Sequence, residues 1–305
     1  MADRLGFCFG VKQAVDDIVK ALKNVEASKN IEGSKNVEGS KDKDRICSKG
    51  VWSIGMPIHN SQEVARLQAM GLRVARDASE IPDGANVLIR AHGEARSVLE
   101  TLRARGTQVI DTTCPFVRRA QKRAGELSSQ GYHIVLLGDV SHPEIRSIMG
   151  HVNGAVDVVA SVAEVEKLPR LQRVALVSQT TQREDLLAMI AETLVLKTEE
   201  LCVCNTICKA TVERQDAVRR LAGRVDGMIL VGSKESANTT KLRDIAGING
   251  MAVLWIESAG ELDKFDNMGE MARRWFEGRQ RIGIAAGAST PEWLITEVCN
   301  KIARM

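Results

Sequence analysis

Short aliphatic stretches alternate with longer amphipathic stretches along the whole chain. Three of the aliphatic runs are bounded by glycine or polar residues, at 133–138, 226–232 and 251–256. Such runs are typical of buried parallel strands. Apolar residues recur at helical spacing in 11–22, 117–128 and 213–225. The alternation predicts α/β units with right-handed crossovers and small, mainly parallel sheets.

One pattern occurs three times within this alternation. In each copy a cysteine lies between an apolar stretch and a predicted helix, in LGFCFGV, DTTCPFV and NTICKAT around Cys8, Cys114 and Cys208. A strand-like run ending in a polar loop comes next, in SIGMPIHNSQEV, IVLLGDVSHPEI and MILVGSKESANTT. His142 and Ser236 both follow their cysteine by 28 residues. A third polar loop follows in each copy, in LIRAHGEA, ALVSQTTQRE and GIAAGASTPEW.

Fixed-period similarity of this kind indicates three α/β repeats, which we place at 1–107, 108–197 and 198–305. Each repeat offers one thiolate and two polar loops, so the pattern favours one site on a pseudo-threefold axis. One segment departs from the pattern, because the tandem hexapeptides KNVEAS, KNIEGS and KNVEGS run from Lys23 to Ser40 and are followed by KDKD. Their glycines, alternating charges and small apolar content predict a solvated insertion of low order at about 23–44.

Charge and cysteine content exclude several classes of function. The chain has 42 Lys and Arg against 39 Asp and Glu, a formal net charge of +3, and no basic block typical of nucleic-acid proteins. No apolar run reaches the length of a membrane span, and the N-terminal segment lacks the apolar core of a signal peptide. We therefore expect neither a nucleic-acid nor a membrane partner. Seven cysteines in a chain of this length favour free thiols in a reducing, cytoplasmic compartment.

The polar loops have the sequence signature of helix N-termini. Four of them place Ser, Thr or Asn three residues before Glu, as in a capping box: Asn60 and Glu63, Ser141 and Glu144, Thr181 and Glu184, Ser289 and Glu292. Each loop taken alone is explained as an ordinary helix cap. Taken together, helix N-termini at the carboxyl ends of parallel strands form ready anion sites. The candidate phosphate donors on these loops are His59, His92, His142, Thr180, Ser236, Asn238 and Ser289.

Three single cysteines on distant loops are a weak metal signature by spacing alone, since zinc ligands usually come in close pairs. An iron–sulfur cluster held by three thiolates, with one iron left open, suits the pattern. Cys208 is the favoured ligand of the third repeat because it occupies the loop position shared with Cys8 and Cys114. The remaining cysteines are interpreted as buried or structural residues: Cys47, Cys202, Cys204 and Cys299.

Nine segments carry a resemblance that spans nearly the whole chain. In chain order they are GFCFGVKQAV, IHN, RAHG, DTTCPFV, HPE, SQTT, ICKATVERQDAV, GSKESANTTKL and AAGASTPEW. The chain resembles the family of 4-hydroxy-3-methylbut-2-enyl diphosphate reductases, the LytB family. The resemblance implies three similar α/β domains in a pseudo-threefold arrangement around a central iron–sulfur cluster. It also implies reductive dehydroxylation of an allylic diphosphate to isopentenyl and dimethylallyl diphosphates, the last step of the non-mevalonate isoprenoid pathway.

The resemblance also implies roles for residues that match the family's motifs. The implied ligands of one [4Fe-4S] cluster, with one iron open to the substrate, are Cys8, Cys114 and Cys208. Glu144 would be the proton source, acting through Thr180, with His142 near the reacting end of the substrate. The implied diphosphate clamp comprises His59, His92, Ser236, Asn238 and Ser289. Electrons would come from a ferredoxin or flavodoxin-like partner.

Three positions depart from the family's pattern. Ala237 stands where a second serine is usual, Ser147 where glycine is common, and Ala285 where threonine is frequent. The departures bear on substrate affinity more than on reaction type. Ala237 favours one alternative, a paralogous reductase for another diphosphate. A second alternative is a non-enzymatic cluster protein, which would have no use for Glu144 or for a ring of phosphate donors.

Overall fold

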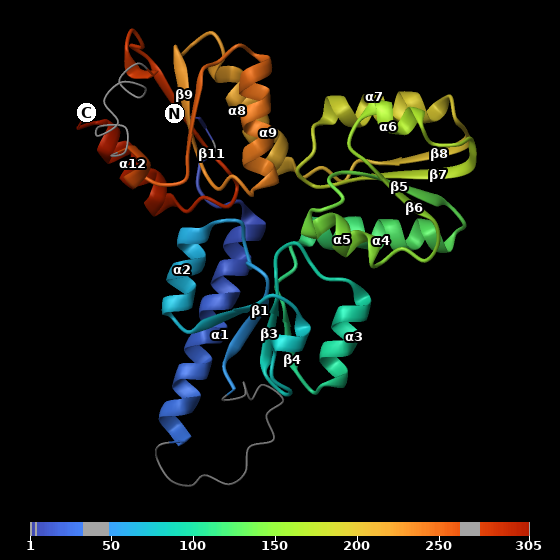
Figure 1. Cartoon of the computed structure of the whole chain (residues 1–305), viewed down its shortest axis with the longest axis horizontal. Coiled ribbons are helices and arrows are strands. Elements are labelled where there is room, and N and C mark those ends of the chain that lie inside the picture. Colours follow the sequence, from blue (N-terminus) through green and yellow to red (C-terminus); the bar gives the residue numbers. More distant parts are fainter. Residues whose placement is uncertain (1, 4, 33–48, 263–274, 305) are drawn as a thin grey trace. The chain divides into compact units, whose positions relative to one another are not determined.

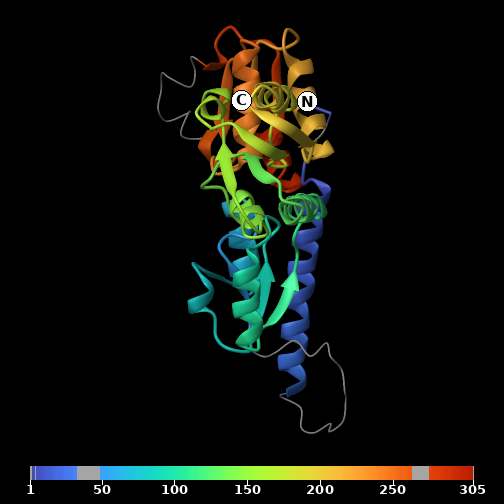
Figure 2. The same cartoon turned by 90° about the vertical axis from the view of Figure 1, so that its right-hand side faces the viewer.

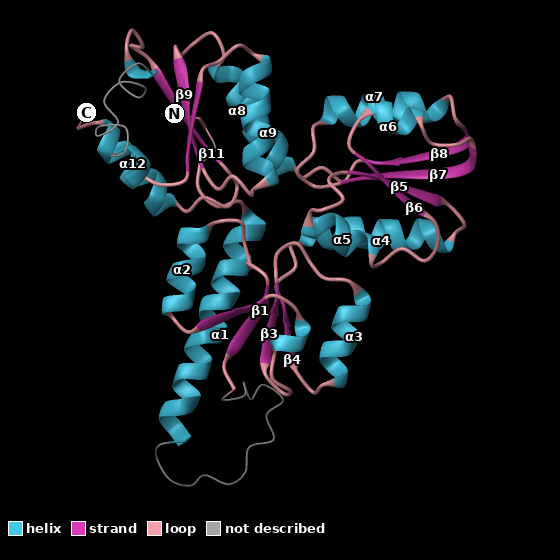
Figure 3. Cartoon of the chain, in the orientation of Figure 1, coloured by secondary structure: helices cyan, strands magenta, loops and turns pink. Residues whose placement is uncertain are grey.

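The computed structural model describes residues 2–3, 5–32, 49–262 and 275–304, and these form three separate β-sheets (Figures 1 and 3). The first sheet has the order β2-β1-β3-β4, the second β6-β5-β7-β8 and the third β10-β9-β11. Every pairing is parallel, which confirms the predicted class. The strands are β1 (Val51–Ile54), β2 (Leu72–Ala75), β3 (Asn86–Ile89), β4 (Gln108–Asp111), β5 (His133–Leu137), β6 (Val156–Val159), β7 (Leu171–Ser178), β8 (Thr198–Cys204), β9 (Gly227–Val231), β10 (Val253–Ile256) and β11 (Ile282–Ala286).

The helices connect these strands in right-handed α/β order. They are α1 (Phe9–Glu32), α2 (Ser61–Ala69), the short 3-10 helix η1 (Ala78–Glu80), α3 (Arg96–Ala104), α4 (Pro115–Ser129), α5 (Pro143–Met149), α6 (Val162–Glu166), α7 (Glu184–Val195), α8 (Lys209–Leu221), α9 (Ala237–Ile248) and α12 (Glu292–Ile302). The helices expected at 11–22 and 117–128 are therefore present. The third lies four residues earlier than expected, because α8 begins at Lys209, directly after Cys208, and ends at Leu221, where a turn follows. None of the helices in the described ranges is long and apolar enough to cross a membrane.

Aliphatic cores join the helices to the faces of each sheet. On the first sheet, Ile18 of α1 and Leu67 of α2 pack on one face, and Leu102 of α3 packs on the other. On the second sheet, Leu127 of α4 and Ile145 of α5 share a face (Figure 1). On the third sheet, α8 and α9 share one face and α12 covers the other. Burial of these side chains supplies the main driving force for folding.

The strand orders place the predicted polar loops at ligand-binding edges. In each sheet the order reverses between two adjacent strands, β1 and β3, β5 and β7, or β9 and β11. Reversals of this kind leave a crevice outside the carboxyl ends of the strands. The six polar loops predicted from the sequence follow these six strands. The cysteine loops of the second and third repeats follow the outer strands β4 and β8.

The chain divides into two compact units. One contains Met1–Phe9, Thr180–Met189 and Ile207–Met305, and the other contains Gly10–Gln179 and Ile190–Thr206. The first unit therefore holds the third sheet, and the second unit holds the other two. The segment before α1 was expected in the first repeat, but Ala2 N donates to Ile284 O of β11 at 2.8 Å. This segment therefore packs with the third sheet.

The sheets end later than the repeat boundaries expected at 108 and 198. β4 pairs with β3 in the first sheet, and β8 pairs with β7 in the second. We therefore propose repeat boundaries after Asp111 and after Cys204. The shift of several residues has a simple origin, because β4 and β8 are edge strands with exposed positions and lack the continuous aliphatic signature of a buried strand.

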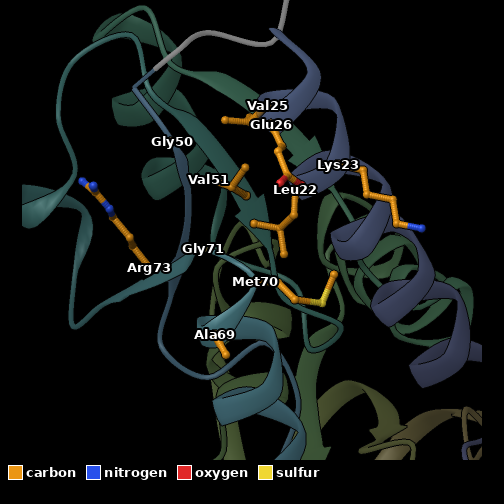
Figure 4. A pocket seen from close by; sticks show the side chains of 10 residues that line it. All are labelled: Leu22, Lys23, Val25, Glu26, Gly50, Val51, Ala69, Met70, Gly71 and Arg73. Carbon is orange, nitrogen blue, oxygen red and sulfur yellow. The ribbon is translucent and has the colours of Figure 1, made fainter. Parts of the chain in front are cut away.

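The low-order insertion expected at about 23–44 begins later than the sequence indicated. α1 continues through the first hexapeptide to Glu32, well beyond the ends of the strands that it covers (Figures 1 and 2). Val25 is buried in the core of the first sheet, and with Leu22 and Met70 it lines a hollow of about 550 Å³ beside the start of β1 (Figure 4). The spacing of Ile18, Leu22 and Val25 continues the apolar stripe of the helix. Residues 33–44 of the expected insertion lie outside the described residues.

Candidate functional site

All three motif cysteines lie at the start of a helix. Cys8 directly precedes α1, and Cys114 and Cys208 are the N-cap residues of α4 and α8. The six cysteines in the described part of the chain are free thiols. A helix N-terminus carries partial positive charge and stabilises a thiolate placed there. This shared position suits cysteines that act as metal ligands. Cys8 and Cys208 belong to one unit, and Cys114 belongs to the other.

Cys8 and Cys208 both belong to the unit with the third sheet, and they interact electrostatically. Cys8 N donates to Ala288 O at 3.0 Å, and Cys208 N donates to Thr180 O at 2.9 Å. Burial raises the pKa of the Cys208 thiol, and nearby Cys8 raises it further. Arg214 of α8 lowers this pKa; its buried guanidinium donates to Gly6 O at 2.8 Å. The backbone N–H groups of Ala210 and Thr211 at the start of α8 also lower the Cys208 pKa, and groups that favour the thiolate suit a cysteine that binds metal.

Cys114 lies in the other unit against the first turn of α1. A Cβ atom built on Gly10 would be only 2.3 Å from Cys114 Sγ. Only glycine therefore leaves space for the sulfur at this position. Cys114 N donates to Ala91 O at 3.0 Å, in the loop that carries His92. The hydrogen bond fixes the cysteine loop beside the histidine loop.

Three histidines from three separate loops meet in this same unit. The ring centroids of His59 and His92 are 4.4 Å apart, and those of His142 lie 5.5 Å from His59 and 5.4 Å from His92. Candidate ligand nitrogens of the three rings all lie within 4.8 Å of one another. His59 follows β1, His92 follows β3 and His142 follows β5. Three of the six loops expected around an anion therefore meet here, while Thr180, Ser236, Asn238 and Ser289 belong to the other unit. The same nitrogens could also hold a metal ion.

The histidine cluster is uncharged near neutral pH. Burial lowers the pKa of His59 to about 4, assisted by the positive charge of Arg90. Burial, together with the neighbouring His59, lowers the pKa of His142 to about 4. Burial also places the pKa of His92 well below its usual value. Three neutral imidazoles can each donate one N–H to an anion, and a bound anion would raise these pKa values.

The tautomer of His142 is fixed by the helix that it caps. Glu144 N donates to His142 Nδ1 at 3.1 Å. A neutral imidazole that accepts at Nδ1 carries its proton on Nε2, so Nε2 is the donor toward a ligand. Glu144 follows in the first turn of α5, and its side chain is buried. The sequence thus brings a hydrogen-bond donor and a carboxyl group to one helix N-terminus.

Two buried polar pairs support the histidine loops. Arg90 Nη2 donates to Glu94 Oε1 at 2.6 Å on either side of His92. Gln121 Nε2 of α4 donates to Ser147 Oγ of α5 at 2.6 Å, directly behind Gly93. This hydrogen bond accommodates the serine that departs from the family's pattern. Arg90, Glu94 and Gln121 belong to none of the candidate sets predicted from the sequence. Their polar side chains are the only local signal that could have indicated them.

The loops after β9 and β11 form a second polar cradle in the other unit. Ser236 caps α9, and its Oγ accepts from Thr239 N at 3.4 Å. Asn238 Oδ1 accepts from Ala288 N at 3.1 Å, which leaves the buried Nδ2 donor without a hydrogen-bond partner. Ser289 is also buried. An unpartnered buried amide donor between two helix N-termini fits an absent anion. Thr180 belongs to this unit as well and is buried.

The capping predictions were partly wrong. Asn60 caps α2 as expected, since its Oδ1 accepts from Glu63 N at 2.9 Å. His142 rather than Ser141 caps α5, because Ser141 instead donates to Asp139. Pro291 rather than Ser289 is the N-cap of α12.

The cysteines outside the motifs take other positions. Cys202 and Cys204 lie on β8, where Cys204 is buried in the core of the second sheet and Cys202 packs against it. Arg123 donates to Cys204 Sγ at 3.7 Å. Cys299 is partly buried in the core on the α12 face. These positions agree with a structural role, while Cys47 lies outside the described residues.

Taken together, the fold and its loops define an α/β protein with three parallel sheets, single cysteines at helix starts, and candidate phosphate donors in the loops that follow the strands. The chain belongs to the LytB protein family, whose sequence profile matches residues 1–303. The full-length match confirms the resemblance that the nine motifs indicated.

Individual relatives cover almost the whole chain. The 4-hydroxy-3-methylbut-2-enyl diphosphate reductase of Geobacter sulfurreducens is 39% identical over 302 residues, which cover 99% of this chain and 95% of the relative. The enzyme of the same name from Campylobacter hominis is 38% identical over 306 residues, covering 100% and 98%. A solved structure of (E)-4-hydroxy-3-methyl-but-2-enyl diphosphate reductase, described as the terminal enzyme of the non-mevalonate pathway, is 36% identical with a TM-score of 0.65, covering 100% and 98%. The reductase structure from Plasmodium falciparum is 24% identical with a TM-score of 0.81, covering 98% and 85%, and supports the fold.

Proposed function

We propose that this chain is an iron–sulfur reductase that converts (E)-4-hydroxy-3-methylbut-2-enyl diphosphate to isopentenyl and dimethylallyl diphosphates. The observation that carries the proposal is the cluster of His59, His92 and His142, which are partly or fully buried, in a chain that matches the family over its full length. Three neutral imidazoles are a suitable donor set for a diphosphate. Their convergence favours a substrate site over a simple electron carrier, which has no need for phosphate donors.

The residues present fit a [4Fe-4S] cluster. Cys8, Cys114 and Cys208 would hold it, each at the start of a helix. The missing Cβ of Gly10 leaves room for Cys114 Sγ, and the helix N-terminus at each cysteine favours the thiolate, the form of cysteine that binds metal. When bound, such a cluster supplies electrons and one open iron that acts as a Lewis acid on the substrate's hydroxyl oxygen.

The protein's own donors would hold the diphosphate. In one unit these are the histidines of the cluster, with His142 donating through Nε2. In the other unit, the free Nδ2 of Asn238 and the first-turn amides of α9 are donors, joined by Ser236 and Ser289. Ala237 lacks a hydroxyl, but its backbone N–H lies in the first turn of α9 and can still donate. Anchoring the diphosphate lets binding energy orient the reacting carbon.

Glu144 would supply protons. Loss of the hydroxyl as water breaks one C–O bond and consumes two electrons and two protons, one for oxygen and one for carbon. Glu144 is buried at the N-terminus of α5, two residues from His142, so its carboxyl group lies close to the histidines of the proposed substrate site. Thr180 would pass the proton on through its hydroxyl.

The proposal extends to the partner and the compartment. Two electrons per turnover require an external donor, which we propose to be a ferredoxin or flavodoxin-like protein. The free thiols of the described cysteines support a reducing, cytoplasmic compartment.

The experiment that tests the function is anaerobic oxidation of reduced methyl viologen by the cluster-loaded protein, with and without the hydroxymethylbutenyl diphosphate. We expect oxidation that depends on substrate and yields the two five-carbon diphosphates, identified by mass and chromatography. An intact cluster without turnover of this substrate would contradict the assignment and favour a paralogous reductase, for which Ala237→Ser is the next variant to make.

A further inference from the structure

The helix that follows Cys114 carries a concentration of positive charge. α4 contains four cations and a single acidic residue, Glu126. Arg118, Arg119 and Lys122 are exposed, and Arg123 is partly exposed. The chain as a whole has a formal net charge of only +3, so this one helix is a local departure from a balanced surface. A dense single-sign surface attracts partners of opposite charge.

Arg96 of α3 extends the positive charge beyond α4. Its Nη2 would lie 3.4 Å from a Cβ built on Gly125, which places the guanidinium against α4. Arg96, Arg118, Lys122 and His151 line a hollow of about 610 Å³ in which Glu126 is the one acidic residue. We call Arg96, Arg118, Arg119, Lys122 and Arg123 the α4 basic surface.

Nearby acids do not neutralise the α4 basic surface. Arg118 pairs with Asp111 at 3.1 Å, and Glu126 is shared between Lys122 at 3.7 Å and Arg123 at 3.2 Å. These pairs are exposed, and exposed pairs are weak and screened by solvent. Arg119 makes no ion pair within the described part of the chain. Five cations against Asp111 and Glu126 leave a net charge of +3 on this surface.

The position of the α4 basic surface relates it to the proposed chemistry. Cys114 is the N-cap of α4, and Arg118 N donates to Cys114 O at 3.0 Å. The first cation of the surface therefore lies one helical turn from a proposed cluster ligand, within a single unit. A protein seated on this turn comes close to the sulfur through which electrons can enter.

We propose that the α4 basic surface is the docking site for the electron donor, and that this donor is a small acidic one-electron carrier of the flavodoxin or ferredoxin class. The inference rests on the proposed reductase function, because only a cluster at Cys114 gives the position its meaning. Charge complementarity between such a carrier and the surface speeds the encounter and fixes orientation more than it adds affinity. Donor selectivity is therefore expected to depend strongly on ionic strength.

The test uses the cluster-loaded Arg119→Glu/Lys122→Glu variant. Turnover is measured with two electron sources, reduced methyl viologen and a reduced flavodoxin of strongly negative net charge. Binding of the oxidised flavodoxin is measured separately by calorimetry. The matched control is Lys167→Glu/Arg170→Glu, which reverses two exposed cations in the same unit, away from α4. We expect flavodoxin-dependent kcat/KM to fall about tenfold or more at low salt in the first variant alone, with the difference shrinking as salt increases.

Each outcome separates the docking proposal from the function proposal. Unchanged flavodoxin affinity and turnover in the α4 variant would overturn the docking site. An equal loss with methyl viologen, or a raised KM for the diphosphate, would also overturn it, because the surface would then act on substrate or chemistry. If the wild-type protein gave no turnover with methyl viologen, the function proposal would fail, while selective loss of flavodoxin binding would still support docking.

Discussion

The uncharged histidine cluster predicts a specific dependence of stability on pH. The pKa values of His59 and His142 are lowered to about 4, whereas a histidine in the unfolded chain titrates near its ordinary pKa of about 6.5. Between about pH 4 and about pH 6.5, His59 and His142 are mostly protonated in the unfolded state but mostly neutral in the folded state. The free energy of unfolding therefore falls as pH drops from about 6.5 towards 4, and this loss ends below about 4.

The magnitude follows from the two pKa values. At pH 5, an unfolded histidine is almost fully protonated and either buried histidine is almost neutral, so each costs about 2 kcal/mol of stability relative to pH 8. Because repulsion between His59 and His142 causes part of the shift, the pair should cost somewhat less than about 4 kcal/mol. This is a large share of the roughly 5–15 kcal/mol that stabilises a typical protein.

Urea unfolding of ligand-free protein at pH 8 and pH 5, followed by tryptophan fluorescence, measures the loss. His59→Asn should reduce the loss of unfolding free energy between pH 8 and pH 5 by about 2 kcal/mol, because the variant lacks one histidine that stays neutral in the folded state. Val64→Ala is the matched control, because it truncates a buried apolar side chain of α2 and should lower stability equally at both pH values. If His59→Asn lost as much stability between pH 8 and pH 5 as the wild-type protein, the buried neutral cluster would be refuted.

Three further predictions concern the proposed site. Glu144→Gln should keep the cluster spectrum but lower turnover about a hundredfold or more, because a proton donor is removed; equal turnover in this variant and in the exposed Glu166→Gln control would exclude Glu144 from the mechanism. Gly93→Ala should raise the substrate KM and destabilise the protein by about 1–3 kcal/mol, because φ is +75 and the new Cβ would lie 2.3 Å from Gln121 Nε2. Gly106→Ala, with φ +67 and open space around it, should change urea stability but leave KM unaltered, and a similar KM in both variants would argue against a role for the His92 loop. Asn238→Asp keeps the acceptor for Ala288 N but replaces the free donor with a negative oxygen, so calorimetry should show pyrophosphate binding weakened about tenfold or more, and unchanged affinity would remove Asn238 from the clamp.

The parts of the fold that could be predicted from the sequence are those encoded locally. Aliphatic runs such as 133–138 have the composition of buried parallel strands, and the structure confirms them as strands. Edge strands were harder to delimit because their side chains are only partly buried, as in β8. The continuation of α1 was missed because the hexapeptides have the composition of a solvated loop, whereas the burial of Val25 depends on the sheet beneath it. Tertiary packing overrides a compositional signal in that segment.

The site was predictable where it depends on loop chemistry and unpredictable where it depends on packing. The three histidine loops could be identified as candidates from their positions in the repeats, and the ring distances show that their histidines meet. The hydrogen bond between Gln121 and Ser147, which supports the His92 loop, forms because α4 packs against α5. No local sequence pattern encodes that packing. The association of the segment before Cys8 with β11 is equally non-local.

The positions at which the chain passes from one unit to the other should constrain where its length can change during evolution. The passages fall between residues 9 and 10, 179 and 180, 189 and 190, and 206 and 207. Three of them lie within two residues of Cys8, Thr180 or Cys208. An insertion at any of these three points would move a proposed ligand or proton-relay residue along the chain, so selection should hold their length constant. Variation in chain length should instead accumulate between Glu32, where α1 ends, and Val51, where β1 begins, a stretch of sequence that includes the last of the tandem hexapeptides.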